Sequence, residues 1–239
     1  MRKPIFYTVL FTMTLFASCI NMGERVKGSG KIISETRHVD NAEKIKLLGD
    51  MDIYIDEGPN SVKVEGDDNV LQYVETVSDD NWLQIRTRDN INISTSEPIK
   101  VYITTPKITD LNVSGSGNIK CNQKFSVDDN TSFNVSGSGD ILVAINAPKV
   151  KASISGSGNL HISGETKDVS IHISGSGNYD GPELKAENAD VSIAGSGDAT
   201  LFADERLKAS IAGSGNIKYK GNAVVDSHIA GSGSVSKSQ

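Results

Sequence analysis

The chain has 239 residues, among them 23 glycines and only 5% aromatic residues, and its formal net charge at pH 7 is −6. Many small residues and few bulky ones favour a β-rich protein without a thick globular core. The negative charge argues against a nucleic-acid partner, because phosphates require a basic surface. We therefore expect no nucleic-acid binding.

The N-terminus has the pattern of a secretory signal. Two basic residues precede an apolar segment, 5–16, that is too short to span a bilayer, and small residues follow up to Cys19. This pattern resembles that of bacterial lipoproteins, in which the cysteine is lipidated and becomes the N-terminus after cleavage. An ordinary secretory signal with an incidental cysteine is the alternative. We predict a signal peptide over 1–18 and a lipid-anchored tether over 19–30, which would hold the protein at the outer membrane, on the cell surface or on the periplasmic face.

Cys19 and Cys121 are the two cysteines of the chain. With Cys19 lipidated, Cys121 has no partner, which excludes a disulfide framework. We expect Cys121 to be a small, partly buried residue. Because the sequence has no CxxC motif and no cluster of cysteine and histidine, we expect no metal and no cofactor.

Residues 31–110 are predicted to form an N-terminal β domain. Apolar and polar residues alternate there in several short segments, the first over 45–55, as in strands with one buried face. One stretch differs, because Asp67 and Asp68 are candidates to cap one or two helical turns over 70–74. The expected domain is therefore built almost wholly of strands.

From residue 111 to the end, one hexapeptide dominates the sequence. Its first copy is VSGSGN, and the copies start at residues 113, 135, 154, 173, 193, 211 and 229, a spacing of 18–22 residues. Apolar residues alternate on both sides of the copies. This pattern predicts a β-solenoid over 111–239, in which each turn buries its apolar face against its neighbours. The expected fold class is all-β, with the N-terminal strands continuing into the solenoid.

The glycines of the repeat are best explained by backbone geometry. A glycine at a fixed place in each turn indicates a positive φ, a bulge, or stacked chains that leave no room for a Cβ atom. Stacked turns would also align the serine and asparagine side chains in ladders. The structural glycines are Gly115, Gly117, Gly137, Gly139, Gly156, Gly158, Gly175, Gly177, Gly195, Gly197, Gly213, Gly215, Gly231 and Gly233.

Three other roles fit the spacing of the motif less well. A phosphate-binding loop requires one glycine motif between a strand and a helix. Calcium-binding β-rolls have a repeat of about nine residues, with an Asp in almost every repeat. Here only Asp140 and Asp198 occupy the Asn position of the motif. A flexible linker would not keep apolar residues in phase on both sides.

Longer segments extend the comparison to a known family. The segments IKLLGDMDIYIDEGPNSVKVEGDDNVLQYV and VYITTPKITDLNVSGSGNI, with the GSGN and GSGD motifs after short apolar strands, resemble the head GIN domain family of auto-transporter adhesins, a group common in Bacteroidetes. The resemblance covers roughly residues 30–235. It implies a β-solenoid-like fold in a secreted or lipid-anchored envelope protein, with an interaction role and no binding residue that can be carried over.

Catalysis is the main alternative, because β-helices also host polysaccharide lyases and hydrolases. Such enzymes require carboxylate pairs or basic residues beside a metal. The repeats contain one arginine, Arg206, and scattered acidic residues, with a small acidic loop over 180–187. Three histidines are expected to face outward from strands: His161, His172 and His228. Three aromatic residues are expected in the core rather than in a sugar-stacking surface: Tyr73, Trp82 and Tyr102. We predict no catalytic residue.

The sequence thus predicts a non-enzymatic, lipid-anchored envelope protein with adhesin-like binding. The Ser- and Asn-rich faces of the solenoid would bind a polymer, either a glycan or a protein. A structural spacer or sensing protein in the periplasm is one alternative, and a carbohydrate-active β-helix enzyme is another. A last turn that ends near Val235 would have an open sheet edge, which leaves room for an oligomer or a covering tail.

Overall fold

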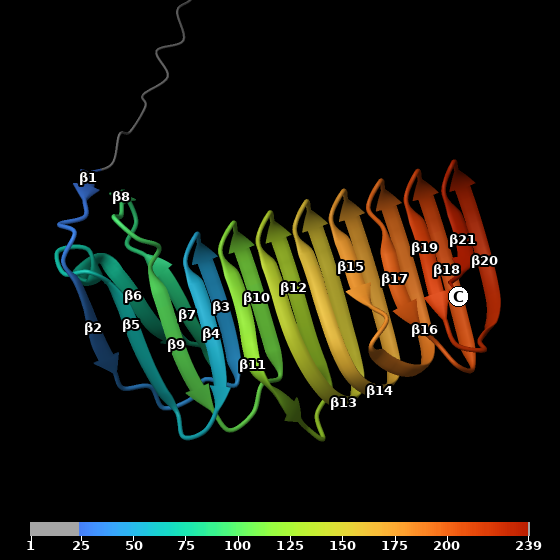
Figure 1. Cartoon of the computed structure of the whole chain (residues 1–239), viewed down its shortest axis with the longest axis horizontal. Coiled ribbons are helices and arrows are strands. Elements are labelled where there is room, and N and C mark those ends of the chain that lie inside the picture. The colour runs from blue at the N-terminus through green and yellow to red at the C-terminus, as the bar shows by residue number, and fades with distance from the viewer. Residues whose placement is uncertain (1–23, 239) are drawn as a thin grey trace, which may run out of the picture.

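The computed structural model describes residues 24–238, which form a β-solenoid (Figure 1). In each turn a strand runs toward a glycine corner, and the next strand returns from it on the opposite side of the core. We call the strands that lead to the glycine corners the first sheet and the strands that follow them the second sheet. The expected all-β solenoid with a repeat of 18–22 residues is confirmed.

The first sheet is parallel from β7 to β20, and β6 joins its N-terminal edge in the antiparallel sense. Its inward residues are apolar and alternate with mostly polar residues that face outward, because successive side chains of a strand point to opposite faces. In spatial order the strands are β6 (Val74–Asp79), β7 (Trp82–Thr87), β3 (Lys44–Gly49), β10 (Asp110–Gly115), β12 (Thr131–Gly137), the second parts of β13 (Asp140–Gly156) and β14 (Asn159–Gly175), β16 (Leu184–Gly195), β18 (Arg206–Gly213) and β20 (Val224–Gly231).

The second sheet is parallel from β9 onward and begins with two antiparallel pairings at its N-terminal end. In spatial order its strands are β2 (Ile32–Arg37), β5 (Ser61–Asp67), β9 (Lys100–Thr105), β4 (Asp52–Glu57), β11 (Asn118–Ser126), the first parts of β13 and β14, β15 (Asn178–Gly181) with the start of β16, β17 (Ala199–Phe202), β19 (Asn216–Lys220) and β21 (Ser234–Lys237). A separate parallel pair joins β1 (Glu24–Lys27) to β8 (Ile91–Ser94).

The stacking register explains why the sequence repeats. Each first glycine pairs with the first glycine of the next turn, as Gly137 does with Gly156 and Gly156 with Gly175. Every position therefore lies against its own copy in the neighbouring turns. Ile154, Ile173 and their counterparts form one buried column inside the core. The repeat thus records one local environment that recurs along the axis.

The stacked turns begin earlier than the repeated hexapeptide. β3 and β4 pair in parallel with β10 and β11, and Gly49 stacks beneath Gly115 with a φ of 126°. The alternation over 45–55 is therefore two strands with a corner between them, and not one strand. Met51 occupies the place of the second glycine, and the corner that follows stacks on it. Both sheets run without a break through residue 110, and the proposed division of the chain there stays a prediction.

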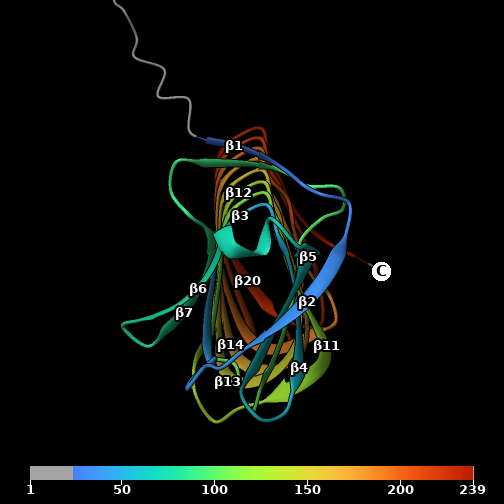
Figure 2. The ribbon, with the colours of Figure 1, turned by 90° about the vertical axis from the view of Figure 1, so that its left-hand side faces the viewer.

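A single turn of 3-10 helix, η1 (Leu71–Tyr73), lies across the N-terminal end of the core (Figure 2). Val70 and Leu71 are fully buried beneath it. The expected capping by Asp67 and Asp68 is wrong, because η1 has no side-chain cap. The Asp67 carboxylate is buried and instead accepts hydrogen bonds from the amides of Gly30 (2.7 Å) and Ser96 (2.9 Å).

One continuous apolar core runs between the sheets from the N-terminal end into the last turns. Its members are mostly Ile, Val, Leu and Ala, which agrees with a thin core built from few aromatic residues. Among residues 24–238, no helix is long and apolar enough to cross a membrane.

Candidate functional site

The glycine corners are filled by the backbone of the neighbouring turn. In all seven copies the first glycine has a φ between 121° and 138°, a backbone angle that residues with a Cβ atom rarely adopt. A Cβ atom on the second glycine of the third copy, Gly158, would lie 2.0 Å from the carbonyl oxygen of Gly139. The amides of Ser157 and Gly158 donate to the Gly137 carbonyl, at 2.8 and 3.1 Å. These amides are already used in stacking, so the corner is not a cradle for phosphate.

A ladder of polar side chains follows the corners along the second sheet. The Asn118 Nδ2 group donates to Asp52 Oδ1 (2.8 Å), and the Asn159 Nδ2 group donates to Asp140 Oδ1 (2.8 Å). Asn159 in turn accepts a hydrogen bond from Asn178 Nδ2 (3.0 Å). The expected ladder is confirmed for the Asn position. Because its members bind one another, the ladder stabilises the stack of turns. Its members are Asp52, Asn118, Asp140, Asn159, Asn178, Asp198, Asn216 and Ser234.

The outer face of the first sheet carries a strip of small residues beside the corners. Ser136, Ser155 and Ser174 are exposed in successive turns, and alanine takes their place from Ala194 onward. The strip is flat because no member has a large side chain. It offers hydroxyl groups to a partner and no walls to enclose one.

A hollow lies at the opposite edge of the sheets, at the second corners, where the chain turns from the second sheet back into the first. It is on the side of the second sheet. This basal groove has a volume of about 760 Å³ and crosses five successive turns. The turn that starts at the first copy has 22 residues, three more than the next turn. Two of the extra residues form a bulge in β11 between Lys120 and Lys124, and the loop after β11 helps to line the groove. The groove is lined by residues 126–128, 146–148, 165–167, 185–187, Phe202 and Asp204.

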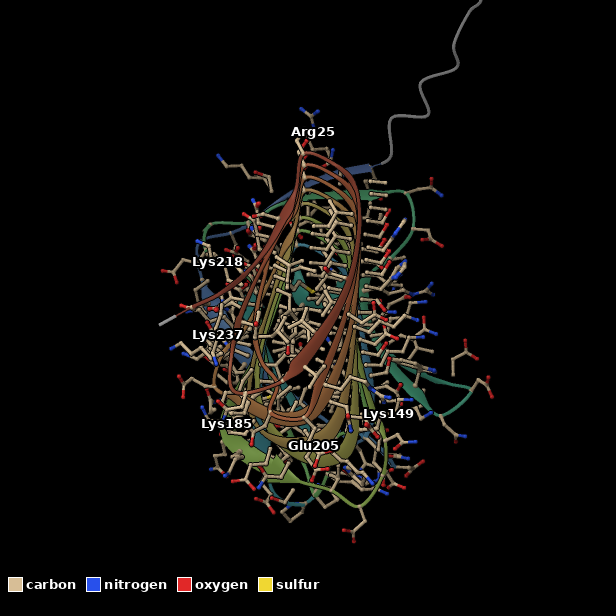
Figure 3. All side chains as sticks on the ribbon, turned by 90° about the vertical axis from the view of Figure 1, so that its right-hand side faces the viewer. Arg25, Lys149, Lys185, Glu205, Lys218 and Lys237 are labelled. Carbon is tan, nitrogen blue, oxygen red and sulfur yellow. The ribbon has the colours of Figure 1, made fainter. Side chains whose placement is uncertain are left out.

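Carboxylates outnumber ammonium groups in the basal groove. The carboxylates belong to Asp128, Glu165, Glu187 and Asp204, and the ammonium groups to Lys167 and Lys185. Four acids and two lysines give the lining a formal charge of −2. Figure 3 shows Lys185 and Glu205 around the second corners, seen from the C-terminal end of the solenoid.

Apolar surface and a buried polar atom complete the groove. The half-buried ring of Phe202 lies beneath Lys185, whose Nζ atom is 4.4 Å from the ring centroid. Asn146 donates to the Ser126 hydroxyl (3.3 Å), while its Oδ1 atom is buried and has no protein partner. Because this oxygen has no accessible surface, it is not available to a ligand in the groove. The groove residues come from five separate segments, one in each turn, and no motif in the sequence links them.

A second hollow, of about 630 Å³, lies across the second corners on the side of the first sheet. Its basic residues Lys149, Arg206 and Lys208 are matched by three aspartates, 168, 190 and 226. The hollow has no aromatic residue in its lining. Its balanced charge gives less selectivity for a ligand than the charge of the basal groove.

The residues weighed for catalysis are dispersed. Each of the three repeat histidines faces outward, as expected, and the closest to an acid is His161, whose Nδ1 atom lies 3.1 Å from Asp180 Oδ2 on the exposed surface. No group of three or more metal-ligating side chains occurs among residues 24–238. Burial raises the pKa of the Cys121 thiol to about 12, with a smaller contribution from Asp56, so this thiol is not a reactive nucleophile. Cys19 lies outside the described residues.

Of the aromatic residues expected in the core, Tyr102 and Trp82 lie on the outside of the sheets, and Tyr73 is half-buried in η1, with its ring centroid 5.7 Å from Arg88 Cζ. Tyr54 and Tyr102 stack with ring centroids 5.5 Å apart on the outer face of the second sheet, and Lys63 lies 4.4 Å above the Tyr102 ring. Trp82 is half-buried on the first sheet near Lys44. The expectation was wrong because Tyr102 and Trp82 stand at outward positions of their strands, while the rings that the core does hold are those of Phe125, Phe133 and Tyr179.

Comparisons with known proteins agree with this architecture. A family model described as "Putative auto-transporter adhesin, head GIN domain" matches residues 41–223. No curated protein matches the sequence.

Solved structures from Bacteroides and Parabacteroides species share the fold. A "putative adhesin" from Bacteroides fragilis is 22% identical, with a TM-score of 0.82 over 89% of this chain and 100% of that one. A "putative adhesin" from Parabacteroides distasonis is 28% identical, with a TM-score of 0.70 over 90% and 100% of the two chains. A "putative lipid binding protein" from the same species is 24% identical, with a TM-score of 0.76 over 90% and 100%. None of these three is named as an enzyme.

Proposed function

This chain belongs to the head GIN domain family, and we propose that it is a non-enzymatic binding module whose basal groove holds an extended glycan. The observation that carries the proposal is the course of the groove across five turns. Neighbouring strands of a sheet are about 4.8 Å apart, so a polymer that lies along the axis would meet a new turn at every step of that length. A repeating partner suits a repeating surface.

The chemistry of the groove favours a glycan. Carboxylates accept hydrogen bonds from sugar hydroxyl groups, and the Phe202 ring offers an apolar surface to a sugar ring. The formal charge of −2 favours neutral or amino-sugar polymers over acidic ones. A role in binding rather than catalysis is supported by the family description and by the names of the similar structures.

We test the groove with binding of the purified protein to immobilised polysaccharides. The panel contains neutral, amino-sugar and acidic polymers. We expect retention on neutral or amino-sugar polymers and loss of roughly tenfold in affinity for Phe202→Ala, because the apolar platform is removed. Glu187→Gln should weaken binding to amino sugars more than binding to neutral polymers.

The matched control is Thr200→Ala. Thr200 lies on the same strand as Phe202, faces the same side and is outside the groove lining. It should bind as the unmodified protein does. Equal binding by the Phe202 and Thr200 variants, or no retention on any polymer, would contradict the proposal and would favour the structural spacer, for which the continuous core of stacked turns is sufficient.

We also propose that Cys19 anchors the protein to the outer membrane through a lipid, with the solenoid outside the cell. The support is the sequence pattern around Cys19. The test is protease treatment of intact cells that produce the full-length protein or a Cys19→Ala variant. We expect the unmodified protein to be cleaved on whole cells and the variant to leave the membrane fraction. A membrane-bound protein that is protected until lysis would place the solenoid in the periplasm and remove the adhesin role.

A further inference from the structure

The two ends of the solenoid core differ. At the N-terminal end, η1 and the strands around it bury Val70 and Leu71 completely. At the C-terminal end, β20 and β21 each pair with one described strand and leave their other edge free. Ile229 is 40% exposed there, whereas its inner neighbour Ile211 is 1% exposed. Solenoid cores require cover at both ends, so the face made by β20 and β21, here the terminal face, is a site for a partner.

A second copy of the chain can extend both apolar columns through a contact between two terminal faces. Head-to-tail stacking would instead set the terminal face against an end where η1 covers the core and the antiparallel strand β2 forms the edge (Figure 2). A twofold axis perpendicular to the two sheets sets β20 antiparallel to β20 of the second copy. The contact is then closed and does not lead to fibres.

The inner side chains of β20 select the position of that axis. Directly opposite residues of an antiparallel pair lie on the same face. An axis through Ser227 sets the inward Val225 opposite Ile229 of the second copy, so both apolar columns continue across the contact. An axis between two residues would set inward side chains against outward ones and would expose both columns.

The outer side chains agree with the same axis. With the axis at Ser227, Asp226 lies opposite His228 of the second copy, and Val224 lies opposite Ala230. Val224 is 76% exposed in the single chain, and this pairing covers it. A shift of the axis by one residue sets Asp226 or His228 opposite its own copy, which removes the complementary pair. Apolar, polar and charged positions are therefore all matched in one register.

We infer that the protein forms a twofold dimer through its terminal face, with β20 paired to β20 of a second copy around Ser227. The dimer does not depend on the proposed glycan ligand. It would give one particle two basal grooves, which strengthens attachment to a polymer through effective concentration.

The test uses a cysteine on the axis. Ser227→Cys in the full-length protein is exposed to a mild oxidant in membranes, and we expect a disulfide-linked dimer on a non-reducing gel, because the two thiols face each other. Ser232→Cys is the control. It lies five residues from the axis, so the two copies would be about 33 Å apart, too far for a disulfide. Equal yields for the two variants would overturn the dimer.

A charge exchange between Asp226 and His228 provides a second measurement in the Ser227→Cys background. His228→Asp sets Asp opposite Asp226, and we expect the cross-linking yield to fall roughly fivefold. The double variant Asp226→His with His228→Asp restores the pairing and should restore the yield. A double variant as weak as His228→Asp would overturn the register.

Discussion

At the residue scale, the corner glycines show two separate costs of adding a side chain, which are backbone strain and crowding. Gly49 has a φ of 126° and open space around its Cβ position, whereas a Cβ on Gly158 would meet the carbonyl oxygen of Gly139. We expect Gly49→Ala to reduce the free energy of unfolding by about 1–3 kcal/mol through strain alone. Gly158→Ala should cost at least about 3 kcal/mol, because the carbonyl cannot move without breaking the sheet. Urea unfolding followed by circular dichroism measures both.

Ser157→Ala is the control for the glycine variants. Its side chain is exposed at the corner, and the stacking contact is made by its amide, which alanine retains. The change in stability should stay within about 0.5 kcal/mol. A Gly158→Ala variant as stable as the Ser157 variant would show that the corner relaxes around a Cβ atom.

Cys121 gives a prediction on pH. Its pKa is raised from 9.0 in the unfolded chain to about 12 by burial. The folded state therefore holds the proton more tightly, so this stability is complete below pH 9 and is lost as the pH rises from 9 toward 12. We expect a loss of about 2 kcal/mol by pH 10.5. The melting temperature should fall more steeply with rising pH in the unmodified protein than in Cys121→Ala. Equal slopes for the two proteins would contradict the raised pKa of Cys121.

At the scale of the elements, the side-chain ladder constrains which residues may stack. Asn159 donates to Asp140 and accepts from Asn178, so it separates a carboxylate from its neighbours. Asn159→Asp would remove the donor and set two carboxylates one strand spacing apart. We expect the free energy of unfolding to fall by about 1–2 kcal/mol at pH 7. The loss should become smaller below about pH 4, because the carboxylates are then protonated.

The exposed loop residue Asn130 is the control for the ladder. Asn130→Asp adds the same charge away from the second sheet and should change the free energy of unfolding by less than about 0.5 kcal/mol. If Asn159→Asp is as mild, or if its penalty does not shrink in acid, the hydrogen bonds of the ladder contribute little to stability.

At the scale of the whole molecule, the sequence predicted what repeats and missed what does not. The corners, the buried columns and the Asn ladder follow from a spacing that every copy shares. The corner at Gly49 was missed because Met51 replaces the second glycine, which is allowed where no earlier corner stacks beneath it. The basal groove was missed because residues such as Asp128 and Phe202 line one hollow only after five turns have stacked, and no motif in the sequence links them.

The stacked architecture predicts that a whole turn can be removed. Deletion of residues 157–175, which is one spacing of 19 residues, joins Gly156 to Ser176 and sets Asn178 on Asp140 as Asn159 was before. Each remaining position keeps its column, so the protein should fold with a β-sheet spectrum and lose only the stability of one turn. Deletion of residues 157–166 removes half a turn, which breaks the alignment of both sheets, and should prevent folding. Circular dichroism and thermal unfolding distinguish the two. Equal behaviour of both variants would mean that the native stack does not depend on the register of its turns.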